Sequence, residues 1–422
     1  MSGAGCGSAD VGTTGSGGTS EPGTGGEWMG GTGGLQGSGG TGPDLGTGGA
    51  TGTGGAVGPG TGGSGSGGRG APGGAAGGTG GRAGTGGATG TGGALVTGSG
   101  GASTAGAVPL NPAMLSDCTG ANPMRCTIPV PANGDYNVTV ELGDPAVASV
   151  TRVQAELLHI EVPTLSLAAG QLSQQTFSVN VRAEQHDGYS APGMVLNLII
   201  DGSAPHLHGL GFAAAPNIPT IFVAGDSTVC DWDPAAANIL DPLQRGWAQE
   251  LSQYLDPGIA VANYADSGET ASSFYGKFFP PARAAMRAGD YLFIQFGHND
   301  QKVAADVANY QANLMRYITD ARTRNVTPVL FTPVARKGAS AGNPGFAGLD
   351  QQARMLAASQ NVALVDLTML AIAYYRTVPN LSTVFATPSE GTHFSEAGAT
   401  QIANLVAQAL KASSVPLKTF IK

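Results

Sequence analysis

Charged residues are scarce in this chain, and no dense run of Lys or Arg occurs anywhere in its 422 residues. The formal net charge is -9 at pH 7. Because a phosphate backbone is bound by a clustered basic face, we expect no nucleic-acid partner. The sequence also lacks an apolar stretch of transmembrane length, so we expect no segment that spans a membrane.

Cysteine is rare as well, with four residues at Cys6, Cys118, Cys126 and Cys230. Cys118 and Cys126 enclose a short segment whose Gly, Asn and Pro residues suit a turn. We predict a local disulfide between them, as in an exported protein, with two reduced surface thiols as the alternative. Their spacing fits no usual zinc pattern, and we predict no metal site.

Cys6 follows small residues and precedes a long glycine-rich segment, which resembles the processed start of a bacterial lipoprotein. The charged and apolar regions of a signal peptide do not precede it. Three alternatives stay open: a start assigned too late, export by another route, or an incidental cysteine. We expect an extracellular or cell-surface protein, tethered through Cys6 if that residue is lipidated.

Glycine is the residue in excess, and it is concentrated at one end. Of the 70 glycines, 48 fall in residues 1–107, in irregular repeats with Thr, Ser and Ala. Few large apolar groups are present there to offset the entropy of ordering so many glycines, so we predict a flexible, disordered linker. These glycines lack the strict third-position period of collagen, which excludes a triple helix.

Residues 108–217 alternate apolar and polar positions in short runs bounded by Gly, Pro, Asn and Asp. The clearest runs are residues 136–142, 176–181 and 194–200. Alternation with β-branched and aromatic residues is typical of half-buried strands. Several such strands without helices between them predict a small all-β sandwich.

Residues 218–422 show a different pattern, in which apolar runs alternate with helical periodicity. The predicted strands are residues 220–224, 259–263, 291–296, 328–332 and 362–365. The predicted helices are residues 243–255, 303–323, 349–358 and 397–411. Continuously apolar strands separated by helices predict an α/β fold, with a parallel sheet covered on both faces.

Four short motifs lie in this last region: Gly225-Asp226-Ser227-Thr228, Asp266-Ser267-Gly268-Glu269, Gly297-His298-Asn299-Asp300 and Glu390-Gly391-Thr392-His393. Ser227 follows the first predicted strand, Gly268 the second and Asn299 the third. Ligand sites form at the carboxyl ends of parallel strands, so we expect these residues on one edge of the sheet. His393 precedes the last helix, where a loop can bring it to the same edge.

The residue types in these motifs suit nucleophilic catalysis. A serine hydroxyl is a poor nucleophile until a base takes its proton, and His393 suits that role for Ser227. The oxyanion that forms next needs donors already in place: the N–H groups of Ser227 and Gly268 and the side-chain amide of Asn299. Each motif alone suits a turn, a helix cap or a loop, but four in order favour catalysis. This chemistry needs no cofactor.

The stretch from Thr220 onwards resembles the SGNH (GDSL) hydrolases, and the rhamnogalacturonan acetylesterases in particular. The matching strings are Ala224-Gly225-Asp226-Ser227-Thr228-Val229, Gly246-Trp247, Gln295-Phe296-Gly297-His298-Asn299-Asp300-Gln301-Lys302 and Gly391-Thr392-His393-Phe394-Ser395. This resemblance implies a flavodoxin-like three-layer fold. It also implies removal of acetyl groups from pectic or other plant polysaccharides through an acyl-serine intermediate.

The resemblance extends to the sandwich and exposes one departure from the family. Residues 133–140 and 201–205 are similar to the β-sandwich that bacterial members often carry before the hydrolase domain. The family usually places Asp three residues before the catalytic histidine, whereas this chain has Glu390. We predict that Glu390 orients His393, with a backbone carbonyl as the alternative. The neighbour of the nucleophile, Asp226, is predicted to hydrogen-bond its own loop instead.

Further residues near the motifs have predicted roles. Cys230 is predicted to be a buried packing residue. Trp247 and His298 are predicted to bind substrate, with Trp232 as a second aromatic that can line a sugar, although helix packing suits Trp247 equally well. We expect a monomer whose substrate is an acetylated polysaccharide or oligosaccharide.

Two other functions stay open on the sequence. One is a lipase or thioesterase of the same fold, which a strong preference for long acyl chains would favour. The other is a polysaccharide-binding protein whose sandwich holds the ligand and whose hydrolase domain is degenerate. An inactive hydrolase region next to a sandwich that binds pectin would favour the second.

Overall fold

The structure, a computed structural model, describes residues 106–186, 189–191, 193–233 and 243–422. The predicted linker lies outside these residues except at its last two positions, and Cys6 lies outside them too. Within the described ranges, none of the helices is long and apolar enough to cross a membrane. Antiparallel sheets occupy the chain up to Ala214, and a parallel sheet begins at Thr220.

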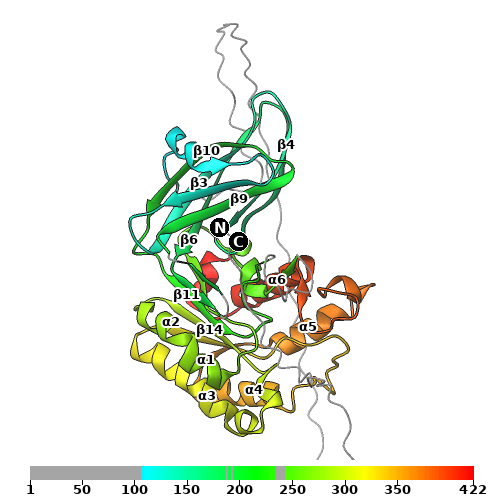
Figure 1. The fold of residues 1–422 in the computed structure, drawn as a ribbon. Helices are drawn as coiled ribbons and strands as arrows, with labels where there is room; N and C mark the ends of the chain where they lie inside the picture. Colours follow the sequence, from blue (N-terminus) through cyan, green and yellow to red (C-terminus); the bar gives the residue numbers. More distant parts are fainter. Residues whose placement is uncertain (1–105, 187–188, 192, 234–242) are drawn as a thin grey trace, which may run out of the picture. The chain divides into compact units, whose positions relative to one another are not determined.

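Two antiparallel sheets form the N-terminal part, called the sandwich below (Figure 1). The first sheet has the order β1 (Cys118–Thr119), β2 (Met124–Pro129), β9 (Val195–Ala204), β4 (Ser149–Ala155), β5 (His159–Leu167). The second has the order β10 (Leu207–Ala214), β3 (Gly134–Gly143), β6 (Leu172–Val181). The strands β7 (Glu184–His186) and β8 (Tyr189–Ala191) pair only with each other.

The sandwich core follows from the alternation in the sequence. In β9, Leu196, Leu198 and Ile200 are buried, whereas the residues between them are partly exposed. Apolar side chains of both sheets belong to one continuous core cluster, as expected when the two inner faces pack together. Cys118 in β1 lies opposite Cys126 in β2, and a disulfide joins them.

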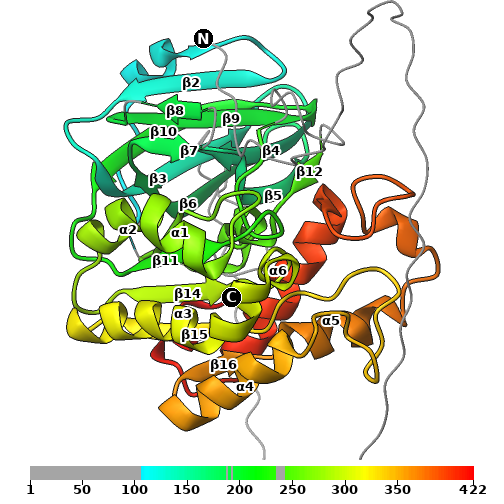
Figure 2. The same cartoon turned by 60° about the horizontal axis from the view of Figure 1, so that its bottom comes forward.

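The C-terminal part contains a five-stranded parallel sheet (Figure 2). Its order is β13 (Ala260–Asn263), β11 (Thr220–Gly225), β14 (Tyr291–Gln295), β15 (Thr327–Phe331), β16 (Ala363–Val365). Numbered along the chain this is the order 2-1-3-4-5, the flavodoxin-like arrangement, whose switch point lies at β11. A separate short ladder joins β12 (Gln244–Arg245) to β17 (Phe394–Ser395).

Helices cover both faces of the parallel sheet, which confirms the predicted three-layer α/β fold (Figure 1). One face carries α1 (Ala271–Lys277), α2 (Phe279–Ala285), α3 (Ala304–Thr323) and α4 (Leu349–Gln360). The other carries α5 (Leu367–Tyr375) and α6 (Glu396–Lys411). Along β11 the side chains alternate between the two cores, with Ile221 and Val223 in one and Phe222 and Ala224 in the other.

The structure differs from the sequence prediction at residues 243–255, which do not form one helix. They form β12 and two short 3-10 helices, Trp247–Glu250 and Ser252–Tyr254. The N–H group of Trp247 donates to the carbonyl of Thr228 at 3.1 Å, so the first part of this segment pairs with a neighbouring loop and the internal hydrogen bonds are confined to two short turns. The helices α1, α2 and α5, of seven to nine residues, were not predicted because so short a segment shows little periodicity.

Candidate active site

Three of the predicted site residues lie just beyond neighbouring strand ends. Strand β11 pairs with β14 up to Gly225 opposite Gln295, and the N–H of Asp266 donates to the carbonyl of Gly225 at 3.1 Å. The loops that follow β11, β13 and β14 therefore begin side by side at one edge of the sheet. Ser227, Gly268 and Asn299 follow within a few residues, at the carboxyl edge where parallel sheets form ligand sites.

The hydroxyl of Ser227 and the ring of His393 are in hydrogen-bond contact. Ser227 Oγ lies 2.9 Å from His393 Nε2, although 166 residues separate them in sequence. Backbone contacts hold His393 in place. Its carbonyl accepts the N–H of Ala386 at 2.9 Å, and strand β17 begins at the next residue. A base at this distance can remove the hydroxyl proton, which is the geometry that nucleophilic serine catalysis requires.

Glu390 accepts the backbone N–H of His393 at 3.3 Å, but its carboxylate lies beyond hydrogen-bond distance of the His393 ring. The separation of Glu390 Oε1 from His393 Nδ1 is 3.6 Å, and Oε1 instead accepts the backbone N–H of Thr392 at 2.8 Å. His393 Nδ1 has no hydrogen-bond partner in the described part of the chain, so a backbone carbonyl does not fill that position either. The adjacent imidazole and the N–H of Thr392 hold the pKa of Glu390 down to about 2. Glu390 is thus ionised near neutral pH and is the acid in contact with His393.

The predicted oxyanion donors Gly268 and Asn299 lie in the loops that follow β13 and β14, at the same edge of the sheet as Ser227. Gly268 has a φ of +80°, a conformation that glycine adopts without the strain other residues incur. Asn299 is 8% exposed, and its Nδ2 donates one hydrogen to the carbonyl of Glu269 at 3.0 Å, which leaves its second amide hydrogen for another acceptor. Asp300 accepts the N–H of Ala271 at 2.9 Å and so ties this loop to the start of α1.

Asp226 hydrogen-bonds its own loop. Its Oδ1 accepts the N–H and the hydroxyl of Thr228 at 3.0 and 2.7 Å, and its Oδ2 lies 3.3 Å from His298 Nδ1. Burial opposes ionisation of Asp226, but the His298 ring and the Thr228 donors lower its pKa overall. Burial lowers the pKa of His298 in turn. The segment 226–232 is called the nucleophile loop below. Its first residue, Asp226, is held by His298, which lies in the loop after β14.

Comparisons with known proteins agree with this geometry. The model of the GDSL-like Lipase/Acylhydrolase family matches residues 223–401. The chain is 33% identical over 218 residues to the rhamnogalacturonan acetylesterase RhgT of Bacillus subtilis, covering 47% of this chain and 92% of RhgT. The chain belongs to this GDSL family. It is a carboxylic ester hydrolase.

A second relative aligns with more of the chain. The esterase is 28% identical over 300 residues to YxiM of Bacillus subtilis, described as an uncharacterized esterase, covering 67% of this chain and 73% of YxiM. The crystal structure of YxiM is 26% identical, covers 70% of this chain and 81% of that chain, and has a TM-score of 0.44. The 300-residue sequence alignment with YxiM is longer than the parallel-sheet region, so it includes part of the sandwich.

Two predicted substrate-binding residues of this esterase lie in its interior, which corrects the prediction. Trp247 is 0% exposed, packs against Phe331 at 5.2 Å between ring centroids, and donates its indole N–H to Gln295. His298 is 2% exposed, with its ring edge on Phe346 at 5.0 Å. A substrate cannot reach either side chain without rearrangement. Their physical role is to support the loops beneath the site.

Trp232 and Cys230 lie in the nucleophile loop and are buried as well. Trp232 donates its indole N–H to the carbonyl of Ser227 at 3.0 Å, and its ring meets the His393 ring edge-on at 5.8 Å. It therefore packs behind Ser227 and His393 and offers no open sugar platform. Cys230 is 0% exposed, as predicted for a packing residue.

Arg336 is a site residue that the sequence prediction missed. It follows β15, donates Nε to Thr392 Oγ1 at 3.2 Å and Nη2 to the carbonyl of His298 at 3.3 Å, and stacks over Phe346 at 5.4 Å. It thus joins the His393 loop to the β14 loop. The sequence did contain one indication of it. Arg336 follows the fourth predicted strand, and residues after parallel strands form ligand sites, which is the argument that placed Ser227 in the site.

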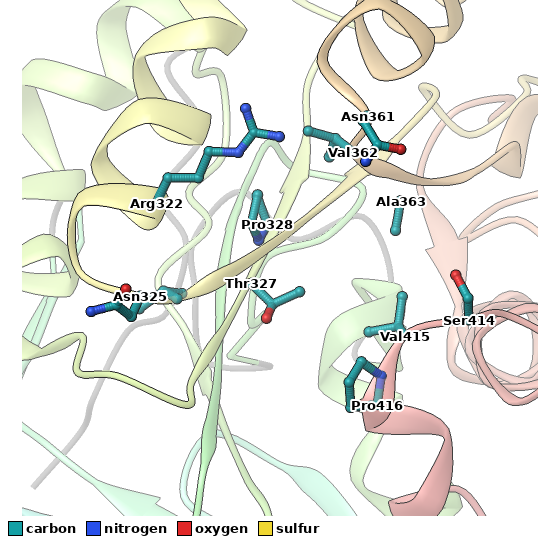
Figure 3. A pocket seen from close by; sticks show the side chains of 11 residues that line it. Arg322, Asn325, Thr327, Pro328, Asn361, Val362, Ala363, Ser414, Val415 and Pro416 are labelled. Atoms are coloured by element: carbon teal, nitrogen blue, oxygen red, sulfur yellow. The ribbon is translucent and has the colours of Figure 1, made fainter.

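A separate cavity lies at the amino edge of the sheet. It has a volume of about 530 Å³ and is lined by the first residues of β15 and β16, among them Thr327, Pro328 and Ala363 (Figure 3). Arg322 and Pro416 also contribute. The four motifs contribute no residue to it.

Proposed function

We propose that this esterase removes acetyl groups from an acetylated plant cell-wall polysaccharide, with pectic rhamnogalacturonan as its substrate. The observation that carries the proposal is the 2.9 Å contact between Ser227 Oγ and His393 Nε2 in a chain that is 33% identical to RhgT. Ser227, His393 and Glu390 are the catalytic residues in this proposal. Gly268 and Asn299 join Ser227 in the oxyanion hole.

The reaction proceeds in two stages. Ser227 Oγ attacks the acetyl carbonyl while His393 Nε2 takes its proton, and the Glu390 carboxylate stabilises the imidazolium that results. The N–H groups of Ser227 and Gly268 and the amide of Asn299 hold the oxyanion. The intermediate collapses as His393 returns the proton to the departing sugar oxygen, which leaves acetyl-serine. Water, deprotonated by His393, then attacks this ester and releases acetate and free serine.

Positively charged side chains on the loops around Ser227 and His393 favour an acidic polysaccharide as the substrate. Arg336 contacts Thr392, Lys302 Nζ lies 3.0 Å from Asn299 Oδ1, and the N–H of Lys337 donates to the carbonyl of Gly391 at 2.8 Å. Arg and Lys bind carboxylates by charge-assisted hydrogen bonds, and pectic chains carry a carboxylate on each uronate. A neutral xylan or chitin chain has no group that uses these charges.

The same proposal places the protein outside the cell, secreted or attached to its surface, and active as a monomer. The disulfide between Cys118 and Cys126 supports an oxidising compartment, since such bonds persist there and are rare in the cytosol.

Acetate release from a substrate panel tests the proposal. The panel comprises acetylated rhamnogalacturonan, acetylated homogalacturonan, acetylxylan, partly acetylated chitin fragments, and 4-nitrophenyl esters of increasing chain length. We expect the highest kcat/KM on acetylated rhamnogalacturonan and a steep fall from acetyl to longer acyl groups. A preference for acetylxylan would contradict the pectic assignment, and a preference for long acyl chains would favour the lipase alternative.

A further inference from the structure

Two side chains of the sandwich contact the nucleophile loop of the hydrolase region. His159 is the first residue of β5, and its Nε2 lies 3.0 Å from Asp231 Oδ2. Arg182 follows β6, and its Nη2 lies 3.7 Å from the same oxygen and donates to the carbonyl of Asn263 at 2.7 Å. His159, Arg182 and Asp231 are 4%, 7% and 0% exposed. The contact is therefore a buried charge cluster and not a surface ion pair.

Asp231 is only four residues beyond Ser227, and the segment between them is closely held. Asn263 Nδ2 donates to Asp231 Oδ1 at 2.6 Å and to the carbonyl of Val229 at 2.9 Å. The indole of Trp232 donates to the carbonyl of Ser227. Movement of Asp231 would therefore be passed to Ser227 through a short chain of fixed contacts.

Gln249 makes a second link between the sandwich and this loop. Its Nε2 donates to the carbonyl of Leu157 in the sandwich at 2.6 Å and to the carbonyl of Trp232 at 3.0 Å. Its Oε1 accepts the N–H of Trp232 at 3.1 Å. Gln249 is 0% exposed, so both links exclude water.

Electrostatics explains why the loop needs partners from the sandwich. A carboxylate without solvent is costly to bury unless it is paired and hydrogen-bonded. Within the described part of the hydrolase region Asn263 hydrogen-bonds the Asp231 side chain, whereas the two basic partners, His159 and Arg182, belong to the sandwich. Without them Asp231 would move toward water and displace the loop that carries Ser227.

We propose that the sandwich is a structural part of the catalytic centre: His159 and Arg182 bind the Asp231 carboxylate and so fix the loop that carries Ser227. This inference rests on the assignment of Ser227 as the nucleophile. His159 and Arg182 are positioning residues, since they act through Asp231 and touch no reacting atom. A misplacement of about 1 Å in a nucleophile can cost roughly a hundredfold in rate, so a modest shift is enough to matter.

The test uses full-length variants and 4-nitrophenyl acetate, which is too small to depend on a sugar-binding surface. His159→Leu removes the donor to Asp231, and we expect kcat to fall roughly ten- to hundredfold with KM little changed. His159→Gln keeps an amide donor and should restore most of kcat. The rate of inactivation by a fluorophosphonate, which reports the reactivity of Ser227 directly, should fall in proportion to kcat.

Two matched controls separate positioning from general stability. His206 faces Asp144 at 3.3 Å in the same sandwich, and His206→Leu should leave kcat unchanged. Arg287 joins the sandwich to the hydrolase region through Asp135 at 3.0 Å, and Arg287→Met should also leave kcat unchanged. If His159→Leu does not fold, Arg182→Met decides, with the same expected loss of kcat.

The outcomes separate this inference from the esterase assignment. A wild-type protein without esterase activity, or a fully active Ser227→Ala variant, would refute the assignment itself. An active wild type with inactive Ser227→Ala and unimpaired His159→Leu and Arg182→Met would overturn only the inference. Equal losses in His159→Leu and the two controls would overturn it too, since general stability would then explain the effect.

Discussion

Two buried histidine–aspartate pairs flank the nucleophile loop, and their histidines titrate in opposite directions. On the hydrolase side, His298 Nδ1 lies 3.3 Å from Asp226 Oδ2. Burial lowers the pKa of His298, and the positive Arg336 beside it acts in the same direction, so Asp226 does not reverse the shift. This histidine is therefore neutral near neutral pH.

The sandwich side has the opposite balance. His159 Nε2 lies 3.0 Å from Asp231 Oδ2. Burial again lowers the histidine pKa, but Asp231 and the nearby Glu161 together raise it by more. The raised pKa favours the ionic form of the pair, which suits an anchor between two regions. A neutral His298 beside His393 suits the proposed mechanism, since it adds no second positive charge next to the imidazolium that would form there.

The largest expected difference between the pairs is in stability. Asp231→Ala leaves His159 and Arg182 buried without their carboxylate, and we expect the free energy of unfolding to fall by about 3–5 kcal/mol. Asp226→Ala removes hydrogen bonds from a neutral histidine and from Thr228, for which we expect a smaller loss of about 1–3 kcal/mol. Urea unfolding followed by tryptophan fluorescence measures both. Equal losses would contradict the ionic character of the sandwich pair.

The third acid, Glu390, contrasts with both pairs because it is partly exposed and contacts the reacting histidine. Glu390→Gln removes the charge that stabilises the His393 imidazolium, and we expect kcat to fall roughly a hundredfold. The melting temperature should barely change. Steady-state kinetics on 4-nitrophenyl acetate and a thermal melt give the two readouts. A large loss of stability with unchanged kcat would make Glu390 a structural residue.

The pH dependence of stability should reveal the opposite shifts directly. With its folded pKa lowered, His298 withdraws stability as pH falls below the ordinary histidine pKa of about 6.5. With its folded pKa raised, His159 contributes stability below that value and loses it as pH rises through the folded pKa. Each slope is at most about 1.4 kcal/mol per pH unit.

A plot of the free energy of unfolding against pH has an acidic limb, assigned to His298, and an alkaline limb, assigned to His159. Single substitutions test this assignment by urea unfolding across the neutral pH range. His298→Gln should flatten the acidic limb relative to wild type, and His159→Gln should flatten the alkaline limb. Other buried acids titrate in both the wild type and the variants, so the difference curves carry the test. Two variants that flatten the same limb would show that the histidines do not differ.

The smallest expected effect concerns Arg336, the cation beside His298. Arg336→Gln should raise KM roughly fivefold on acetylated rhamnogalacturonan, as expected for one partly exposed charge contact. KM on 4-nitrophenyl acetate, which has no uronate, should not change, and Lys418→Gln on a distant surface serves as the control. An equal rise in KM on both substrates would show that Arg336 maintains the structure of the site and does not bind a substrate carboxylate.

Much of the catalytic edge followed from the sequence, because strand order and strand ends are local patterns. The apolar runs before Ser227, Gly268 and Asn299 predicted parallel strands, and parallel strands end at one edge. The contact between Ser227 and His393 was predicted from these strand ends and from the Glu390-Gly391-Thr392-His393 motif before the last helix.

The remaining features depended on packing that no local pattern encodes. Trp247 was a candidate for binding sugar, since an indole can lie in a core or at a surface with the same neighbours in sequence. The contact of His159 with Asp231 joins a strand residue of the sandwich to a loop residue 72 positions away, and the two share no motif. Arg336 was reachable by the strand-end rule, but a single arginine after a strand carries little signal alone.

Covalent labelling of the nucleophile tests the central claim most directly. The wild-type protein is treated with a fluorophosphonate, digested, and analysed by peptide mass spectrometry, with Ser227→Ala and His393→Gln treated in parallel. The account predicts a single adduct on Ser227 in the wild type, none in Ser227→Ala, and much slower labelling in His393→Gln. An adduct on a different serine, or labelling of Ser227 at an undiminished rate without His393, would contradict it.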